Sequence, residues 1–219
     1  MQAAKGYKGM GMEGGIARWY AKLTRKSLPE FEALAQRMAA NLSPGARVLE
    51  VAPGPGYFAI ELAKLGKFEI TGLDISNTFV EIARRNAQQQ HVTVDFQQGN
   101  ASQMPFADAS FDLIVCRAAF KNFSEPVRAL AEMRRVLRPG GKALIIDLRR
   151  DTPQREIDNY IDAMDTGSLN TIFMKWTFRF MLLKRAYTRE EFEKMIAESG
   201  WQKYNIGEAP VGFEITLEK

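Results

Sequence analysis

The sequence contains one cysteine and one histidine in 219 residues, and this scarcity excludes several classes of protein. A single cysteine forms no internal disulfide and no cysteine-based metal cluster. With only one histidine as well, the side chains that usually bind zinc are missing. We therefore expect neither a disulfide framework nor a metal site.

Long apolar runs and long runs of one charge are also missing. The most apolar late stretch, residues 172–187, is interrupted by four lysine or arginine side chains, which makes it too polar to span a bilayer. The start of the chain lacks the apolar segment of a secretory leader. The net charge is only +4, so we expect a cytoplasmic protein that has neither a membrane nor a nucleic acid as its partner.

The most informative segment that is present covers residues 48–58. A β-branched strand there reaches Glu50 and is followed by a turn that contains Gly54 and Gly56, and then by an apolar run typical of a helix. A second acidic residue, Asp74, ends the next expected strand roughly 20 residues later. This is the strand, tight loop and helix of a nucleotide-binding α/β unit, in which the second carboxylate binds a ribose diol.

Strands and helices alternate through most of the chain, which predicts a parallel sheet with helices on both faces. We expect strands at 46–51, 68–73, 92–96, 111–116 and 142–148, and helices at 14–25, 57–65, 76–89 and 124–137. Apolar and polar residues alternate from Val211 to Glu218, as in a half-buried strand that closes the sheet in an antiparallel hairpin. Helix N-caps are expected at Ser27, Ser76, Ser124 and Thr188.

Three further motifs follow the glycine loop in order. They are Gly99-Asn100-Ala101 with a Met-Pro-Phe at 104–106, the strand Phe111-Asp112-Leu113-Ile114-Val115, and Arg135-Val136-Leu137-Arg138-Pro139-Gly140-Gly141. Over about residues 43–219 the chain thereby resembles the class I S-adenosylmethionine-dependent methyltransferases of the small-molecule type. The resemblance implies a doubly wound, Rossmann-like sheet of seven strands in the order 3-2-1-4-5-7-6. It also implies cap helices over residues 1–42, a methyltransferase domain over 43–219, and a helical lid inserted at about 152–186.

By this resemblance the cofactor is S-adenosylmethionine, which leaves as S-adenosylhomocysteine. Glu50 faces the ammonium of its methionine part, Asp74 binds the ribose, Ile75 packs on the adenine, and Asn100 reads the adenine amino group. Glu50 could instead cap nearby backbone N–H groups, and Asn100 could instead form a turn. The full set of implied cofactor residues is Glu50, Ala52, Gly54, Gly56, Asp74, Ile75, Asn100, Ala101, Cys116 and Arg117.

The sequence departs from the family pattern in two places. Ala52 stands where glycine is usual, and two prolines beside Gly54 remove N–H donors, so we expect a stiff loop whose ligand-facing donors are Gly54, Gly56 and Tyr57. Lys121 and Asn122 stand where many relatives have a histidine pair, so an imidazole base is absent there. Cys116 is interpreted as a small buried residue and not as a nucleophile.

The acceptor side is expected to be formed by the lid and the N-terminal helices. Catalytic candidates are Tyr20, Arg117 and Lys121, although Lys121 could equally be a solvated loop residue. Lid aromatics could line an apolar chamber or pack among the helices. Candidate acceptor contacts are Trp19, Tyr20, Phe120, Lys121, Arg149, Phe173 and Trp176.

The sequence thus favours methyl transfer to a small or medium organic acceptor. Three alternatives stay open: an RNA or protein methyltransferase, a non-catalytic scaffold that binds the cofactor, and a nicotinamide-dependent oxidoreductase. The last is disfavoured because no Tyr-x-x-x-Lys pair is present. A homodimer is compatible with the sequence.

Overall fold

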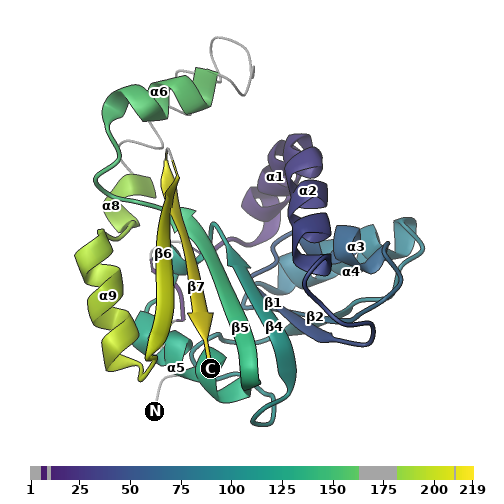
Figure 1. Ribbon diagram of the computed structural model, residues 1–219. Helices are drawn as coiled ribbons and strands as arrows, with labels where there is room; N and C mark the ends of the chain where they lie inside the picture. The colour runs from purple at the N-terminus through teal and green to yellow at the C-terminus, as the bar shows by residue number, and fades with distance from the viewer. Residues whose placement is uncertain (1–5, 9–10, 163–181, 210) are drawn as a thin grey trace, which may run out of the picture.

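The computed structural model describes residues 6–8, 11–162, 182–209 and 211–219 and shows one sheet between two layers of helices (Figure 1). The strand order is β3-β2-β1-β4-β5-β7-β6, as predicted. β1 to β5 pair in parallel, and β7 runs antiparallel to both β5 and β6. The strands are β1 (Arg47–Val51), β2 (Glu69–Asp74), β3 (Asp95–Gln98), β4 (Phe111–Arg117), β5 (Leu137–Leu148), β6 (Lys203–Ala209) and β7 (Gly212–Glu218).

The helices divide between the two faces of the sheet. Those described are α1 (Gly14–Thr24), α2 (Leu28–Ala39), α3 (Tyr57–Ala63), α4 (Asn77–Gln89), α5 (Pro126–Val136), α6 (Gln154–Asp162), α8 (Leu183–Arg185) and α9 (Arg189–Glu198), with short 3-10 turns η1 (Arg25–Ser27) and η2 (Phe120–Asn122). α2, α3 and α4 share one hydrophobic cluster with β1, β2 and β3. α5 and α9 share another with β4, β5 and β7.

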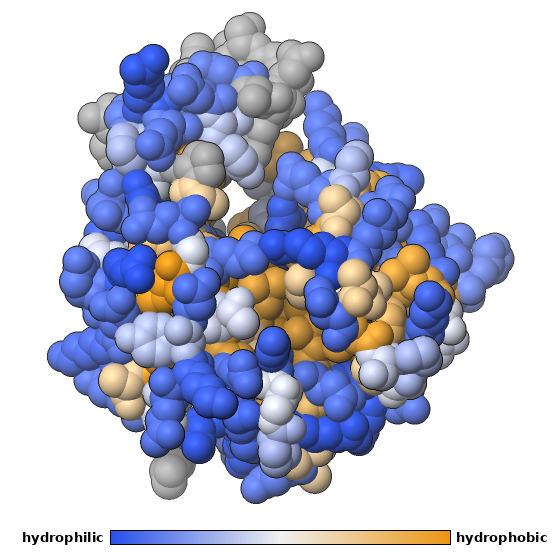
Figure 2. All heavy atoms as spheres, in the orientation of Figure 1, coloured by the Kyte–Doolittle hydropathy of each residue, from blue (hydrophilic) through white to orange (hydrophobic). Residues whose placement is uncertain are grey.

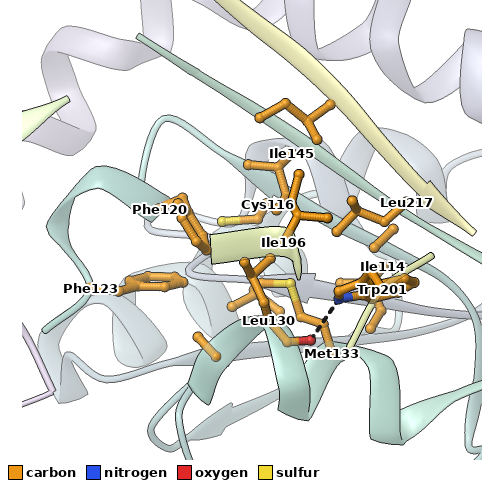
Figure 3. Packing of buried hydrophobic residues seen from close by; sticks show 14 of the residues in the cluster. Ile114, Cys116, Phe120, Phe123, Leu130, Met133, Ile145, Ile196, Trp201 and Leu217 are labelled. Atoms are coloured by element: carbon orange, nitrogen blue, oxygen red, sulfur yellow. Dashed lines mark hydrogen bonds between the residues drawn. The ribbon is translucent and has the colours of Figure 1, made fainter. Parts of the chain in front are cut away.

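Successive residues of the central strands enter opposite clusters, since side chains alternate along a strand. Cys116 belongs to the α5–α9 cluster, whereas its neighbour Val115 belongs to the α2–α4 cluster. Figure 3 shows Cys116 within the α5–α9 cluster, together with Leu130 of α5 and Trp201, which follows α9. The indole N–H of Trp201 donates to the carbonyl of Leu130 at 3.0 Å, which ties the end of α9 to α5.

Two strand predictions are shifted by local hydrogen bonding. β3 begins at Asp95 and not at residue 92, because the N–H of Val92 still bonds to the carbonyl of Ala87 at the end of α4. β5 begins at Leu137, before the Pro-Gly-Gly segment that was expected to precede the strand. Leu137 pairs with Phe111 and Lys142 pairs with Leu113, so the Pro-Gly-Gly segment lies within β5 at a shift in the pairing register.

Two of the four predicted N-caps are confirmed. The hydroxyl of Ser76 accepts from the N–H of Phe79, and Thr188 forms a complete capping box with Glu191. Ser27 makes no side-chain cap, because it is the last residue of the 3-10 turn η1. The prediction for Ser124 is also wrong, because α5 begins at Pro126 and its N-cap position is Glu125.

α6 lies across from α1 and α2 in Figure 1, beyond the carboxyl ends of the parallel strands. It packs through Ile157 and Ile161 against Leu183 and Leu148. Figure 2 shows a hollow between α6 and the α1–α2 pair. The predicted lid residues Phe173 and Trp176 lie outside the described residues. Among the described helices, each is too short or too polar to cross a membrane.

Candidate functional site

Four charged side chains gather at the carboxyl edge of the parallel strands. Glu50 stands one residue before the end of β1, Asp74 ends β2, Arg117 ends β4 and Asp147 stands one residue before the end of β5. Because these strands are neighbours in the sheet, their ends meet at one edge. The sequence predicted the first three of these residues as site residues but not Asp147.

The glycine loop faces an open space. Gly54 is buried, yet a Cβ at this residue would meet no atom within 4 Å, so its Cα is directed into a hollow. A Cβ on Gly56 would lie 2.6 Å from the ring of Phe96, so Gly56 is needed for close packing of the loop against β3. Ala52 has a φ of 57°, a left-handed conformation that the glycine usual in this position adopts with less strain.

The backbone N–H groups of both loop glycines donate to other groups of the protein. Gly54 donates to Oδ2 of Asp74 at 2.9 Å, and Gly56 donates to the carbonyl of Pro53 at 3.0 Å. The prediction that these two groups face the ligand is therefore wrong. The reason is that Asp74 comes within reach of the loop and needs donors in a buried position.

Asp74 is held firmly at the end of β2. Its Oδ1 accepts from the N–H of Ser76 at 2.9 Å, and the residue is 5% exposed. Burial raises the pKa of Asp74 to about 6, while the N–H groups of Ser76 and Gly54 act in the opposite direction. A carboxylate has about four lone-pair positions, so these backbone donors leave it able to accept from a diol as well.

Glu50 is 3% exposed, and its Oε2 accepts from the N–H of Ala59 at 3.1 Å. Glu50 thus accepts a hydrogen bond from a backbone N–H, as its alternative interpretation as a backbone cap expected. The pKa of Glu50 is raised to about 8, chiefly by burial and also by the negative charge of Asp74, while the N–H of Ala59 and the charge of Arg117 act in the opposite direction. No lysine or arginine of the described segments forms an ion pair with Glu50. A ligand ammonium would supply that missing charge.

The expected adenine side is formed by Ile75 and Asn100. Ile75 is 37% exposed, and Oδ1 of Asn100 accepts from the N–H of Ser102 at 2.9 Å. Asn100 therefore forms a turn, as its alternative interpretation expected. The side-chain amide nitrogen of Asn100 takes no part in the hydrogen bond to Ser102. Ala101 packs against the α5–α9 cluster. The contacts of Ile75, Asn100 and Ala101 with a cofactor stay a prediction.

Lys121 is buried, which contradicts its interpretation as a solvated loop residue. Its Nζ donates to Oδ1 of Asp147 at 2.9 Å and to the carbonyl of Ala118. The backbone N–H of Lys121 donates to the other oxygen of Asp147 at 2.8 Å. This ion pair engages the charged ammonium, which is a donor and not a base. The signal for Asp147 was present in the sequence, since it is an acidic residue within the otherwise apolar run from Ala143 to Leu148.

The two arginine candidates are paired with carboxylates of neighbouring elements. Arg117 forms an ion pair with Glu30 of α2, and its guanidinium carbon lies 4.3 Å from the ring centroid of Phe31. Arg149 forms an ion pair with Glu208 of β6. Both arginines are therefore oriented by protein groups, and their contacts with a cofactor or acceptor stay predictions.

The aromatic candidates are divided by the structure. Phe120 is fully buried and stacks on Phe192 with ring centroids 5.1 Å apart, so it packs in the core and does not line the site as expected. Trp19 is 54% exposed on α1. The ring of Tyr20 packs edge-on against Phe79 of α4 with ring centroids 5.9 Å apart, and burial raises the pKa of its hydroxyl.

Cys116 is fully buried in the core, as interpreted from the sequence, and burial raises the pKa of its thiol. The single histidine, His91, lies exposed in the loop after α4. No group of three or more metal-binding side chains occurs among the described residues.

Comparison with known proteins agrees with this geometry. A family model described as a methyltransferase domain matches residues 49–145. The demethylmenaquinone methyltransferase of Deinococcus radiodurans is 41% identical over 102 residues, which cover 46% of this chain and 42% of that protein. The enzyme of the same name from Chlorobaculum parvum is 29% identical, over 78% of this chain and 71% of that protein. The chain thus aligns with less than half the length of the first relative.

Solved structures support the fold. A protein of Methanococcus maripaludis superposes with a TM-score of 0.77, covering 97% of this chain and 95% of its own, at 22% identity. A methyltransferase from Aquifex aeolicus superposes with a TM-score of 0.65 over 92% of this chain and 94% of its own, at 20% identity. The matched domain begins within β1 and ends within β5, so it contains the glycine loop and both buried carboxylates. Residues 49–145 thus match a methyltransferase domain, and the fold is that of solved structures described as S-adenosylmethionine-dependent methyltransferases.

Proposed function

We propose that this chain transfers a methyl group from S-adenosylmethionine to a small ring acceptor of the reduced-quinone or phenol type. The observation that carries the proposal is the pair of buried carboxylates, Glu50 and Asp74, beside the hollow at Gly54. The acceptor class is supported by the relatives, which are named demethylmenaquinone methyltransferases.

The residues at the edge of the sheet fit each part of the cofactor. The remaining accepting capacity of Asp74 suits the ribose hydroxyls, and Glu50 has no cationic partner in the described segments until a ligand ammonium arrives. Ile75 and Asn100 suit the face and the amino edge of adenine. When bound, S-adenosylmethionine supplies an electrophilic methyl group on a sulfonium.

The protein's own contribution is alignment, because no described side chain is positioned as a general base. Glu50 and Asp74 are assigned to the cofactor, and Asp147 is paired with Lys121. Burial raises the pKa of Tyr20, so its hydroxyl stays protonated and is available to donate to an acceptor oxygen. The acceptor must therefore bring its own nucleophile, as an electron-rich phenolic ring does. Correct positioning and exclusion of water then supply most of the rate.

The test begins with S-adenosylhomocysteine. Calorimetry should give a micromolar dissociation constant, roughly −8 kcal/mol. Asp74→Asn should weaken binding by about 2–4 kcal/mol, because charged hydrogen bonds are lost. The matched control is Asp95→Asn at an exposed aspartate of β3. Equal affinity in wild type and Asp74→Asn would mean that the ribose binds elsewhere.

The acceptor class is tested by product formation. Purified protein with S-adenosylmethionine should methylate a short-chain demethylmenaquinol analogue, detected as a gain of one methyl group by mass spectrometry. Bulk RNA and a denatured protein extract are offered in parallel. Methylation of either macromolecule, without methylation of the ring compound, would overturn the small-molecule proposal and favour its alternative.

A further inference from the structure

A short segment near the N-terminus crosses the carboxyl edge of the sheet. We define residues 6–8 as the strap. The N–H of Lys8 donates to the carbonyl of Asn122 at 2.7 Å, and the N–H of Ser124 donates to the carbonyl of Gly6 at 3.5 Å. Tyr7 and Phe123 form the antiparallel bridge between these bonds. The strap is thus fixed as a short strand against the chain that leads from η2 to α5.

The chain just beyond the strap is fixed at the opposite side of the cofactor site. The carboxylate of Glu13 accepts from the N–H groups of Asn77 and Thr78, both at 3.1 Å, and from the hydroxyl of Thr78. The hydroxyl of Ser76 donates to the carbonyl of Met12 at 2.7 Å. Ser76, Asn77 and Thr78 form the N-cap and the first turn of α4, which follows Asp74 closely in the chain. The N-terminal chain therefore has one anchor on each side of the carboxyl edge.

Gly6, the first residue of the strap, lies on the residues assigned to adenine. A Cβ at Gly6 would lie 2.6 Å from Cδ1 of Ile75 and 2.7 Å from Nδ2 of Asn100. Gly6 is itself buried, although it is close to the start of the chain. Only a glycine lets the backbone approach these two side chains so closely. The strap thus lies directly against the two side chains that are expected to contact the nucleoside.

One side-chain contact fastens the end of the strap. The ammonium of Lys8 donates to the hydroxyl of Tyr187 and lies 4.6 Å from the centroid of the same ring. Tyr187 is 9% exposed and packs against Phe120 and Phe192, so it is a rigid partner. Lys8 forms no ion pair with a carboxylate of the described residues. The contact with Tyr187 is therefore the main side-chain restraint on this end of the strap.

We propose that the strap is the outer wall of the cofactor site and that the contact between Lys8 and Tyr187 is its latch. The cofactor enters and leaves only when the strap opens, and closure over the nucleoside slows its release. This inference rests on the proposed adenine contacts of Ile75 and Asn100.

The experiment measures the binding and dissociation rates of S-adenosylhomocysteine by surface plasmon resonance. Lys8→Met and Tyr187→Phe each remove the latch hydrogen bond, and each should raise the dissociation rate about tenfold. The double variant should dissociate no faster than either single variant, because both substitutions remove the same contact. Gly6→Val, which places methyl groups against Ile75 and Asn100, should raise the rate as well. Lys22→Met, at an exposed lysine of α1, should behave as wild type.

A second measurement reports on the strap itself and does not depend on binding or dissociation rates. Hydrogen exchange at the amide of Lys8 should slow when S-adenosylhomocysteine is added to wild type and should slow less in Lys8→Met. Wild-type affinity combined with unchanged dissociation rates in Lys8→Met and Gly6→Val would overturn the strap alone. Failure of wild type to bind S-adenosylhomocysteine would instead overturn the proposed cofactor site, and the strap with it.

Discussion

Nζ of Lys121 lies 2.9 Å from Oδ1 of Asp147, and both side chains are almost completely shielded from solvent. The same carboxylate accepts the backbone N–H of Lys121, so the pair fixes η2 against the end of β5. Burying two charges is costly, and the pair is tolerated because the remaining hydrogen-bonding positions are used. Its location beside the proposed acceptor position makes it a structural support of the site.

Removing one member of this pair should be more harmful than removing both. Lys121→Met leaves Asp147 buried without its partner and should lower the free energy of unfolding by about 3–5 kcal/mol. The double variant Lys121→Met with Asp147→Leu should recover part of that loss. Urea unfolding followed by circular dichroism measures both. A loss below about 1 kcal/mol in Lys121→Met would show that the pair is solvated in solution.

The raised pKa of Glu50 should make stability depend on pH in a defined direction. The pKa of this carboxyl rises from 4.5 to about 8 on folding, so the folded state binds more protons than the unfolded state between these values. The free energy of unfolding should therefore fall as the pH rises from about 4.5 to 8. Asp74, whose pKa is raised from 3.8 to about 6, contributes to the fall below pH 6, so Glu50→Gln should remove mainly the part between about pH 6 and 8. Glu69→Gln, at an exposed residue of β2, should leave the whole fall unchanged. Urea titrations at several pH values give the comparison, and a fall between pH 6 and 8 that persists in Glu50→Gln would assign it to another group.

Cofactor binding should show the opposite trend with pH. An ammonium pairs with the ionised form of Glu50, so binding below pH 8 must release a proton from a carboxyl whose pKa is about 8. The affinity for S-adenosylhomocysteine should rise between pH 6 and 8. Calorimetry in two buffers of different ionisation enthalpy counts the released protons. Glu50→Gln should bind more weakly, with little dependence on pH, and a pH profile equal to that of wild type would argue against the ammonium contact.

One predicted helix cap that forms, at Thr188, and one that does not, at Ser27, offer a matched pair of variants. Thr188 accepts from the N–H of Glu191 and completes a capping box, so Thr188→Ala should cost about 1 kcal/mol of stability. Ser27 precedes α2 but makes no side-chain cap, so Ser27→Ala should be close to neutral. Thermal unfolding of the two variants checks this. Equal losses would mean that the hydroxyl of Ser27 caps α2 in solution.

The local parts of the site could be predicted from the sequence because they are coded by neighbouring residues. Gly54 and Gly56 follow the acidic end of a strand, and Asp74 ends the next one, so the loop and both carboxylates follow from alternation and spacing. The cap at Ser76 and the capping box at Thr188 are likewise local patterns. The hairpin strand β7 was visible in its period of two.

The same local reasoning failed where a distant group competes for a hydrogen bond. The N–H groups of Gly54 and Gly56 were expected to face a ligand, but one bonds to Asp74 and the other closes the loop. Lys121 looked like a loop residue because nothing near it in sequence indicates that Asp147 is its partner, 26 residues away. Phe120 looked like a site residue because its burial depends on Phe192 of α9.

The sequence by itself determined the order of strands and helices, the glycine loop and the two carboxylates at the ends of β1 and β2, since each depends on residues within one or two elements. Only the tertiary structure decided which charges are paired and which segment covers the site. Lys121 meets Asp147, Arg117 meets Glu30, and Gly6 meets Ile75 and Asn100 across long separations in the chain. Such contacts depend on how whole elements pack, and a one-dimensional pattern does not contain that information.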